Sequence, residues 1–301
     1  MTQKNGGVRP FFSIITPSYN QDKYIGKTIR SVLSQSCADF EYLVFDGGSN
    51  DETIPVLKSF NDSIRWISEP DRGQAHAVNK GLAAAQGEII GWLNSDDIYY
   101  PNTLKTVHDF FESHPEAEIL YGMADHIDQN DAIIEPYYTE EWNYDRLKEI
   151  CFICQPAVFF RRSITHTSGF LDEELRYCMD YEYWLRIGRK RQFYYLPQKL
   201  AGSRLYEETK TLGSAVAVHE EILRMFKQKL GHIPDRWIYN HAHVVARALG
   251  LNRDIPEENL RFVKKIIAVS IMDFLRLKHY IPLSGIGTVL NWYFKAITDK
   301  R

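Results

Sequence analysis

The sequence predicts an α/β fold built on a mostly parallel sheet. Over the first hundred residues, short apolar segments alternate with segments of helical periodicity. The apolar segments do not alternate with polar residues, which is typical of strands covered on both faces. Strands separated by single helices imply right-handed crossovers between parallel strands. The strands are expected at residues 11–15, 42–45, 64–67 and 88–93.

The segments between these strands have the features of helices. Apolar residues recur at helical spacing after the first strand. Ser49 and Glu52 have the spacing of a capping box at the start of the second helix. An alanine-rich helix is expected from about residue 73 to 85, with Gly87 as its C-terminal cap. A further helix follows Pro101, which suits a first helical turn.

The chain has 301 residues, enough for one large α/β domain and a smaller second domain. Residues 116–200 have a mixed pattern, whereas the pattern from about residue 214 onward is helical. We therefore expect an α/β domain over residues 1–215 and a helical region over residues 216–301. The helical region includes an apolar stretch flanked by Lys264, Lys265, Arg276 and Lys278. It is expected either to pack, on the first domain or in a homo-oligomer, or to lie on an anionic membrane surface as an amphipathic anchor.

Composition narrows the environment and the partners. Four cysteines are too few for a disulfide framework at this length, which favours a reducing compartment. Residues 1–10 lack the apolar core of a signal peptide, and no stretch of about 18 apolar residues predicts a membrane span. We expect a cytoplasmic protein, soluble or peripheral on the inner face of the membrane. Residues 1–215 hold 22 Lys and Arg against 31 Asp and Glu, an acidic balance that argues against nucleic acid as a partner.

Short polar and acidic side chains follow each of the four predicted strands. Open parallel sheets bind ligands beyond the carboxyl ends of their strands, so these side chains are expected to line one site. Helix capping is an alternative explanation for Ser49 and Asn20. It does not account for Asp96 and Asp97, because adjacent carboxylates repel each other unless a cation lies nearby. The polar segments are residues 16–20, 46–51, 69–73 and 94–97.

This pattern of ligands favours Mg²⁺ or Mn²⁺. Such ions are commonly bound by one or two carboxylates together with substrate phosphates. As a Lewis acid, the ion would neutralise the charge that develops on a departing diphosphate. Neither GxxxxGK[ST] nor GxGxxG occurs after the first strand, so the sequence gives no support for a P-loop NTPase or a dinucleotide oxidoreductase.

Five segments occur in the order and spacing of the family 2 glycosyltransferases, which the chain resembles over roughly residues 10–210. The resemblance implies the GT-A fold, here with a helical C-terminal appendage, and transfer of a sugar with inversion of the anomeric centre. The expected donor is a nucleotide sugar, with UDP favoured over dTDP or GDP, and the expected acceptor is a glycan or a lipid-linked saccharide. The segments are SIITPSYN at residues 13–20, DGGSND at 46–51, EPDRGQ at 69–74, NKG at 79–81 and LNSDD at 93–97.

The resemblance also implies roles for individual residues on the donor side. Asp96 stands at the last carboxylate of the family's DxD motif and would bind the metal, with Asp97 as a neighbour or second ligand. Asn94 replaces the first aspartate of that motif, which leaves open which aspartate meets the metal; it can still bind a ribose hydroxyl. The remaining donor-side candidates are Thr16, Pro17, Ser18, Tyr19 and Asp46 for the nucleoside, Ser95 for the nucleotide sugar, and Arg72, Lys80 and Lys210 for its negative charge. Arg72 and Lys80 could equally be solvated charges on a helix face.

On the acceptor side, residues 179–186 resemble the segment that carries the family's catalytic base. Asp180 then matches the base that takes the proton from the acceptor hydroxyl, with Glu182 as the fallback. The alternative is that Asp180 only caps a helix. Gln155 resembles an acceptor contact. Residues 204–211 resemble the segment that folds over the donor diphosphate, where Lys or Arg would balance its charge.

Two alternative functions and two motifs carry less weight. A nucleotidyltransferase would need a basic, glycine-rich loop in place of residues 16–20, and a non-catalytic binding protein would not need all four aspartates at positions 46, 96, 97 and 180.

The Cys151–Cys154 CxxC motif has no second pair to complete a zinc site. His241 and His243 are expected to be ordinary surface histidines, because residues two apart on a helix point in different directions.

Overall fold

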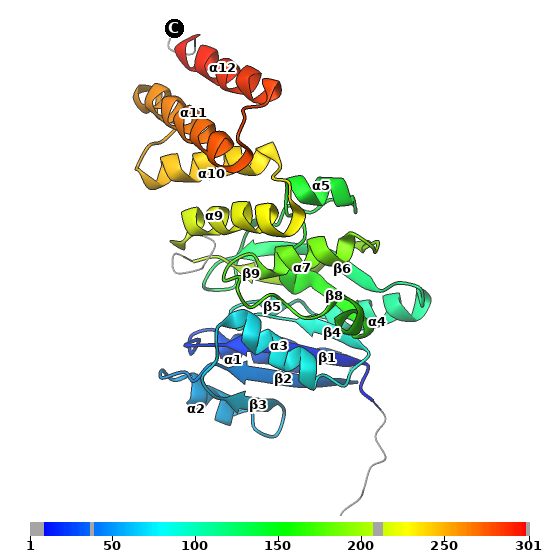
Figure 1. Ribbon diagram of the computed structural model, residues 1–301. Helices are drawn as coiled ribbons and strands as arrows, with labels where there is room; N and C mark the ends of the chain where they lie inside the picture. Colours follow the sequence, from blue (N-terminus) through cyan, green and yellow to red (C-terminus); the bar gives the residue numbers. More distant parts are fainter. Residues whose placement is uncertain (1–8, 37–38, 207–212, 299–301) are drawn as a thin grey trace, which may run out of the picture. The chain divides into compact units, whose positions relative to one another are not determined.

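A computed structural model describes residues 9–36, 39–206 and 213–298 of the chain (Figure 1). The chain divides into two compact units, residues 1–206 and 207–301. The first unit is α/β and the second is helical.

The first unit is built on a mixed sheet in the order β3-β2-β1-β4-β8-β6-β9-β5, with β7 paired to β6. Strands β1 to β4 are parallel and overlap the four segments predicted from the sequence, with boundaries that differ by one to three residues. Beyond β4 the sheet becomes mixed, because β8 runs antiparallel to both β4 and β6. The strands are β1 Phe12–Ser18, β2 Phe40–Asp46, β3 Arg65–Ser68, β4 Ile89–Trp92, β5 Ile98–Tyr99, β6 Ile119–Ile127, β7 Ile133–Pro136, β8 Val158–Arg161 and β9 Tyr194–Arg204.

Helices flank this sheet, and α3 packs against β1 and β2. That contact depends on glycine, since a Cβ on Gly81 would lie 2.3 Å from Cγ2 of Ile15. The central apolar core lies on β1, β2, β4, β6 and β8 and on the helices that cover them. The helices are α1 Ile25–Leu33, α2 Thr53–Lys58, α3 Gln74–Ala84, α4 Thr103–Ser113, α5 Tyr144–Glu149, α6 Ser163–Ser168 and α7 Met179–Gly188, with a short 3₁₀ turn at Gln155–Ala157.

Two local expectations were wrong. Ser49 does not cap α2, because its hydroxyl donates to Asp46 instead and Glu52 occupies the N-cap position without a side-chain bond. Gly87 does not cap α3, which already ends at Ala84. Gly87 is required for close approach, since a Cβ there would lie 2.4 Å from the backbone of Phe12.

The second unit is a set of helices with its own small core. Helix α10 packs against both α9 and α11, and α12 packs against α11. The core holds Phe262, Ile266 and Val269 of α11 against Ala242 and Ala246 of α10. The helices are α9 Ala215–Met225, which continues as a π-helical segment Phe226–Leu230, α10 Asp235–Ala248, α11 Pro256–Lys278 and α12 Leu283–Thr298. Among the described residues, none of these helices combines the length and apolar content that spanning a bilayer needs.

The expectation that His241 is a surface histidine was wrong. Its side chain is buried, and Nδ1 lies 2.6 Å from Oδ2 of Asp273, which is also buried. A second bond joins Oδ1 of Asp273 to Nη2 of Arg276 over 3.0 Å. The three side chains form a polar contact between α10 and α11 within the helical unit.

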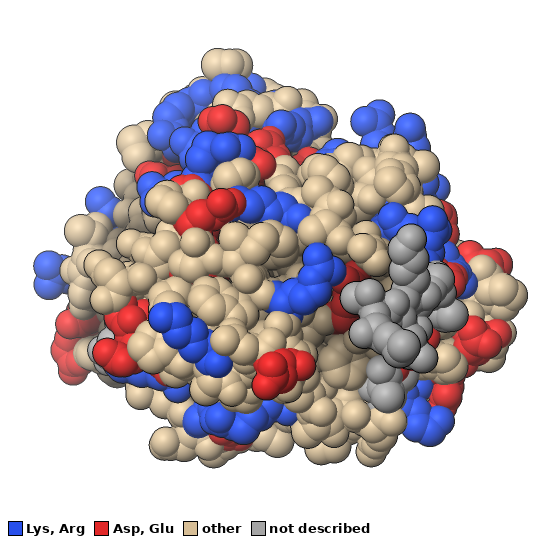
Figure 2. Space-filling model, turned by 90° about the horizontal axis from the view of Figure 1, so that it is seen from below, with Lys and Arg blue, Asp and Glu red and all other residues tan. Residues whose placement is uncertain are grey.

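Charged side chains on the face drawn in Figure 2 are mixed in sign. Acidic and basic residues are interspersed there among uncharged ones, and no broad area carries a single sign. A broad positive area is what nucleic-acid binding requires, so this face gives no sign of it.

Candidate active site

The carboxyl ends of the parallel strands meet along one edge of the sheet. Ser18, Asp46 and Ser68 are the last residues of β1, β2 and β3, and the register places Ser18 beside Asp46 and Asp46 beside Ser68. Strand β4 is the other neighbour of β1, with Trp92 opposite Ile15. Residues 94–97 therefore leave the sheet at the same edge, as the sequence predicted.

Asp46 holds this edge together. Only 1% of the residue is exposed. Oδ2 accepts hydrogen bonds from the backbone N–H groups of Gly48 and Ser49 and from the hydroxyl of Ser68, at 3.0, 2.9 and 2.7 Å. Oδ1 accepts from the hydroxyl of Ser49 at 2.5 Å. The carboxylate thus shapes the turn after β2 and links it to β3, in addition to any contact with a ligand.

The four candidate nucleoside residues at the end of β1 and directly after it differ in their surroundings. Thr16 is buried and its hydroxyl lies 3.0 Å from the hydroxyl of Tyr42, so it faces the core. Pro17 is buried in the strand. The hydroxyl of Ser18 is buried and has no hydrogen-bond partner within the described part of the chain. Tyr19 is 60% exposed. Ser18 and Tyr19 are thus better placed than Thr16 for a contact with ligand.

Asn94 connects the donor edge to the predicted acceptor side. Its side-chain oxygen accepts from Gln74 and Trp92, at 2.8 and 3.0 Å. Its amide nitrogen donates to Oδ2 of Asp97 and to Oε1 of Gln155, at 3.1 and 2.9 Å. The structure thus joins a donor-side candidate, Asn94, to an acceptor-side candidate, Gln155, by a direct hydrogen bond.

The two adjacent aspartates have different environments. Asp97 is only 4% exposed, and Oδ1 accepts from the backbone N–H of Arg204 at 2.8 Å. Burial and the neighbouring charge of Asp96 raise the pKa of Asp97 well above its usual value. Asp96 is half-buried and accepts from the hydroxyl of Tyr206 at 3.0 Å. Asp97 therefore faces the protein interior, while Asp96 remains at the rim with Ser95 buried beside it.

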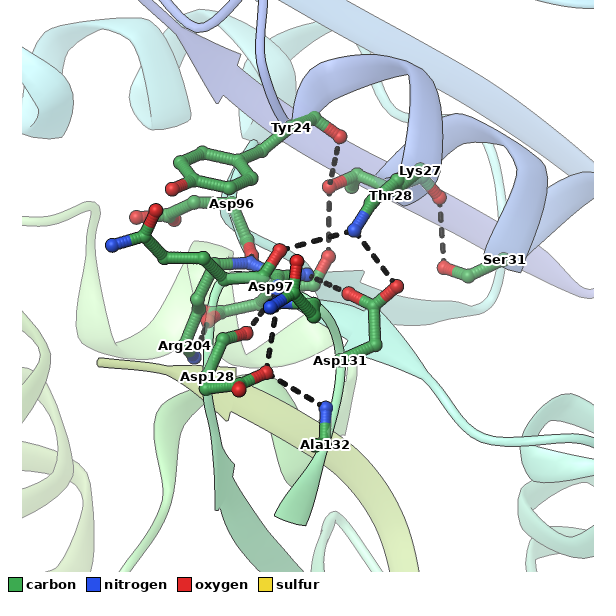
Figure 3. A network of polar contacts seen from close by, with 12 residues as sticks. Tyr24, Lys27, Thr28, Ser31, Asp96, Asp97, Asp128, Asp131, Ala132 and Arg204 are labelled. Atoms are coloured by element: carbon green, nitrogen blue, oxygen red, sulfur yellow. Dashed lines mark hydrogen bonds and ion pairs between the residues drawn. The ribbon is translucent and has the colours of Figure 1, made fainter. Parts of the chain in front are cut away.

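Arg204 fixes the loop that carries these aspartates (Figure 3). Its side chain is fully buried, and Nε donates to the backbone oxygen of Asp96 at 2.7 Å. It also donates to the backbone oxygen of Asp128 and to Oδ1 of Asp131, the latter at 2.6 Å. The guanidinium lies 4.8 Å from the ring centroid of Tyr24. All of these contacts are internal, so Arg204 supports the aspartate loop, and of the basic residues in segment 204–211 only Lys210 remains as the candidate for the donor phosphates.

Asp180 lies in the first turn of α7, as its second residue. The N-cap position belongs to Cys178, so helix capping does not account for Asp180. Burial and then the charge of Asp180 raise the pKa of Cys151. Burial, then Asp97, and to a smaller degree Cys151 and Asp180 raise the pKa of Cys154. The two thiols are therefore part of the buried wall between the aspartate loop and α7, and no described cysteine is in a disulfide.

Glu182 is turned away from that wall. It is 4% exposed, and its two oxygens accept from Nε and Nη2 of Arg186 at 2.8 and 2.9 Å. Arg186 in turn donates to the backbone oxygens of Ser168 and Phe170. Glu182 thus joins α7 to the segment after α6, which leaves Asp180 as the better candidate for the base.

A family comparison decides what kind of protein has this site. The model of glycosyl transferase family 2 matches residues 13–168, which is more than half of the chain and includes the whole donor edge. The chain belongs to this glycosyltransferase family.

Relatives and solved structures agree with that assignment. An uncharacterised glycosyltransferase of Rickettsia prowazekii is 26% identical over 236 residues, covering 73% of both chains. A PGL/p-HBAD biosynthesis glycosyltransferase of Mycobacterium bovis is 31% identical over 185 residues, 59% of this chain and 69% of its relative. The crystal structure of residues 1–349 of S. aureus TarS with UDP-GlcNAc has a TM-score of 0.60 at 18% identity, covering 95% and 90% of the two chains.

A mannosyltransferase from Pyrobaculum calidifontis, solved with GDP-Man and Mn²⁺, has a TM-score of 0.58 at 15% identity, covering 97% and 87% of the two chains. At these identities the two solved structures show that the glycosyltransferase has their fold, the GT-A fold expected from the sequence.

The residues present fit a divalent ion of the kind this family suggests. Within the described ranges, no group of three or more His, Cys, Asp or Glu side chains is arranged to hold a metal. Mg²⁺ and Mn²⁺ sites do not need one, since one or two carboxylates together with phosphate and water oxygens suffice. Asp96 supplies such a carboxylate at the edge of the sheet, and its repulsion with Asp97 is one cause of the raised pKa of Asp97.

The basic candidates of the glycosyltransferase are paired within the protein. Arg72 donates from Nε and Nη2 to Oε2 of Glu173, at 3.1 and 2.5 Å, and its side chain is 68% exposed. Lys80 lies 2.9 Å from Oε1 of Glu69. Each cation therefore already has a carboxylate partner within the protein. Lys210 lies outside the described residues.

Tyr206 and Gln74 lie in segments that resemble the family, but neither was singled out as a site residue. Their contacts with Asp96 and Asn94 join residues 110 and 20 positions apart. Tyr206 follows β9, and β9 pairs with β5 and β6. Only this pairing brings Tyr206 close to the loop that carries Asp96.

Proposed function

We propose that this glycosyltransferase moves a sugar from a nucleotide-sugar donor to a hydroxyl of a glycan or lipid-linked saccharide. The transfer proceeds by direct displacement, inverts the anomeric centre and depends on a divalent metal. The observation that supports this most is the contrast between Asp96 and Asp97. The second is committed to the interior, so the first is left as the carboxylate for a metal–diphosphate group at the ends of the parallel strands.

UDP is the favoured nucleotide. Ser18 and Tyr19 offer a buried unpaired hydroxyl and an exposed ring to the nucleoside, and Asp46 keeps the neighbouring turn in shape. The structure of TarS with UDP-GlcNAc and that of the mannosyltransferase with GDP-Man show that the same fold takes nucleoside diphosphate sugars. Mn²⁺ or Mg²⁺ held by Asp96, when bound, stabilises the negative charge of the departing diphosphate.

Asp180 acts on the acceptor. Its carboxylate accepts the proton of the acceptor hydroxyl as that oxygen forms the new bond to the anomeric carbon. The bond from the anomeric carbon to the diphosphate oxygen breaks, and its electron pair leaves with the diphosphate. The first turn of α7 suits this role, because the N-terminal end of a helix favours a carboxylate in its charged form. Attack opposite the leaving group inverts the configuration.

The two regions of the chain then have different functions. Residues 1–215 bind the donor and acceptor and carry out the transfer, and residues 216–301 serve packing or membrane contact. We place the protein in the cytoplasm, where nucleotide sugars are available to such an enzyme. There it is either soluble or bound peripherally to the inner face of the membrane.

Proton NMR of the first sugar released from a donor tests this function without an identified acceptor. When water takes the place of the acceptor, the protein should hydrolyse an α-linked UDP-sugar and release the β-anomer of the sugar first. This release should require Mn²⁺. Asp180→Asn should abolish the release while the donor still binds. A first-formed product that retains the donor's configuration would contradict direct displacement.

A further inference from the structure

The last two helices of the chain expose an unusual number of apolar side chains. Within the described residues, nine of the seventeen exposed large apolar side chains lie between positions 272 and 297. Contiguous exposed apolar surface of this kind is rare on soluble monomers and marks a site of interaction. The nine are Met272, Leu275, Tyr280, Leu283, Ile286, Leu290, Tyr293, Phe294 and Ile297.

Helix α12 carries most of them on one face. Gly285 and Ala296 are buried, and the ring of Trp292 lies 5.1 Å from that of Tyr239 and 5.6 Å from that of His243. These contacts fix which side of α12 faces α10 and α11. Residues 283, 286, 290, 293, 294 and 297 recur at intervals of three or four on the other side, where they form one apolar stripe.

The exposed charges of residues 261–298 all have one sign. From Arg261 to Thr298 the sequence contains six Lys and Arg residues and a single acidic residue, Asp273. Asp273 is fully buried between His241 and Arg276 and so offers no charge to the outside. Lys264, Arg276 and Lys295 are exposed. The outer surface of α11 beyond its first turn, together with α12, is therefore apolar and basic.

We propose that this surface, residues 261–298 of α11 and α12, docks on an anionic lipid bilayer, with the α12 stripe inserted among the headgroups. A helix with an apolar face and basic flanks binds such a surface through buried apolar area and through attraction to anionic lipids. Contact with a second copy of the chain fits less well. A two-fold contact through this surface would bring Lys264 and Lys295 of both copies together, and residues 261–298 offer no exposed carboxylate to pair them.

Vesicle sedimentation of the full chain tests the proposal independently of any transfer activity. The protein should sediment with vesicles of phosphatidylcholine and phosphatidylglycerol, more weakly with phosphatidylcholine alone, and less as salt is raised. The double variant Leu290→Ser, Phe294→Ser should bind at least about tenfold more weakly, since both side chains are exposed and apolar. The matched control is Ile133→Ser, Ile134→Ser, which changes two exposed apolar residues of β7 and should bind as the wild type does.

A second pair of variants tests the charge. Lys264→Glu with Lys295→Glu should weaken binding to the anionic vesicles by more than about tenfold, because each basic residue near the surface contributes about 1 kcal/mol. Lys58→Glu, at an exposed position of α2, should leave binding to these vesicles unchanged. All substituted positions are exposed, so thermal unfolding midpoints should stay close to that of the wild type.

Two results would overturn the proposal. One is wild-type protein that stays in the supernatant with anionic vesicles. The other is a wild-type dimer in light scattering that Leu290→Ser, Phe294→Ser converts to a monomer while vesicle binding is unchanged; the apolar stripe would then be a contact between copies.

Discussion

The backbone N–H of Arg204 donates to Oδ1 of Asp97 over 2.8 Å, joining residues 107 positions apart in the sequence. The same residue donates through Nε to the backbone oxygen of Asp96. Arg204 therefore turns the second aspartate into the protein and fixes the backbone of the first. This arrangement gives two adjacent carboxylates different environments: Asp97 is buried against Arg204, and Asp96 lies at the rim, where we propose that it meets a metal and a diphosphate.

Arg204→Lys should destabilise the protein. A single ammonium cannot replace the planar guanidinium that donates to Asp96, Asp128 and Asp131, so buried oxygens lose their donors. We expect the free energy of unfolding to fall by about 3 kcal/mol, measured in urea. Arg65→Lys is the control, because Arg65 forms an exposed pair with Glu41 and should cost little. An unchanged unfolding midpoint for Arg204→Lys would show that the buried contacts are not needed.

Asp131 should make stability depend on pH in the acid range. Burial alone would raise the pKa of Asp131, but hydrogen bonds from Lys27 and Arg204 outweigh it and hold the pKa below its usual value. Such a carboxylate stabilises the fold above its unfolded pKa of about 3.9, and the effect is lost as pH falls through the lower folded pKa.

Asp131→Asn tests this without disturbing the backbone, since asparagine also accepts the positive φ of 70° at this position. The thermal midpoint of the variant should lie below that of the wild type at neutral pH. The difference should shrink at pH values below about 4. Asp109→Asn, which removes an exposed pair with Lys105, should change little at either pH. A difference that is the same at both pH values would rule out the ionic contribution.

Asp180→Asn should separate chemistry from binding. The amide keeps the shape of the carboxylate but cannot take the acceptor's proton, so kcat should fall by about 10² to 10⁴. Donor affinity, measured by calorimetry, should stay within a factor of about two, because Asp180 is assigned to the acceptor and not to the donor. Such a factor is less than about 1 kcal/mol in binding free energy. Loss of donor affinity would move Asp180 to the donor side.

Glu182→Gln should have the opposite profile. It replaces one of the two oxygens that accept from Nε and Nη2 of Arg186 by an NH₂ group, which cannot accept. The free energy of unfolding should fall by about 2 kcal/mol, while kcat per folded molecule is retained. A variant of unchanged stability with no turnover would instead make Glu182 the base.

The buried pair in the helical unit should contribute to stability. Asp273→Ala leaves Nδ1 of His241 without its partner at 2.6 Å and removes the bond to Arg276. We expect the free energy of unfolding to fall by about 3 kcal/mol in guanidinium chloride. Asp254→Ala, at an exposed position before α11, is the comparison and should be nearly neutral. Equal stability of the two variants would show that the pair is dispensable.

The parallel strands were predictable because their signal is local. Residues 11–15 and 42–45 are predominantly apolar and do not alternate with polar residues, and that pattern depends on burial from both sides of the sheet. The polar residues after the strands could be assigned to one edge for the same reason. Once strands are parallel, their carboxyl ends must meet, which the pairing of Ser18 with Asp46 confirms.

The partners of individual side chains were not predictable. Ser49 has the spacing of a cap but bonds to Asp46, and Gly87 has the position of a cap but is needed for contact with β1. Arg204 has the charge for a phosphate, yet it is buried beneath the loop that carries Asp96. In each case a contact between distant parts of the folded chain outweighs the local preference. No periodic pattern in the sequence marks that contact.

The most direct test of the metal–donor site is a thermal-shift screen of nucleoside diphosphates and UDP-, GDP- and dTDP-sugars, with and without Mn²⁺. A ligand that binds the native state raises the unfolding temperature by mass action, so no acceptor is required. We predict a Mn²⁺-dependent rise with one nucleotide, UDP by preference, that is lost in Asp96→Ala and kept in Asp145→Ala, a surface partner of Lys148. An equal rise in Asp96→Ala, or no rise with any nucleotide in folded protein, would contradict the account.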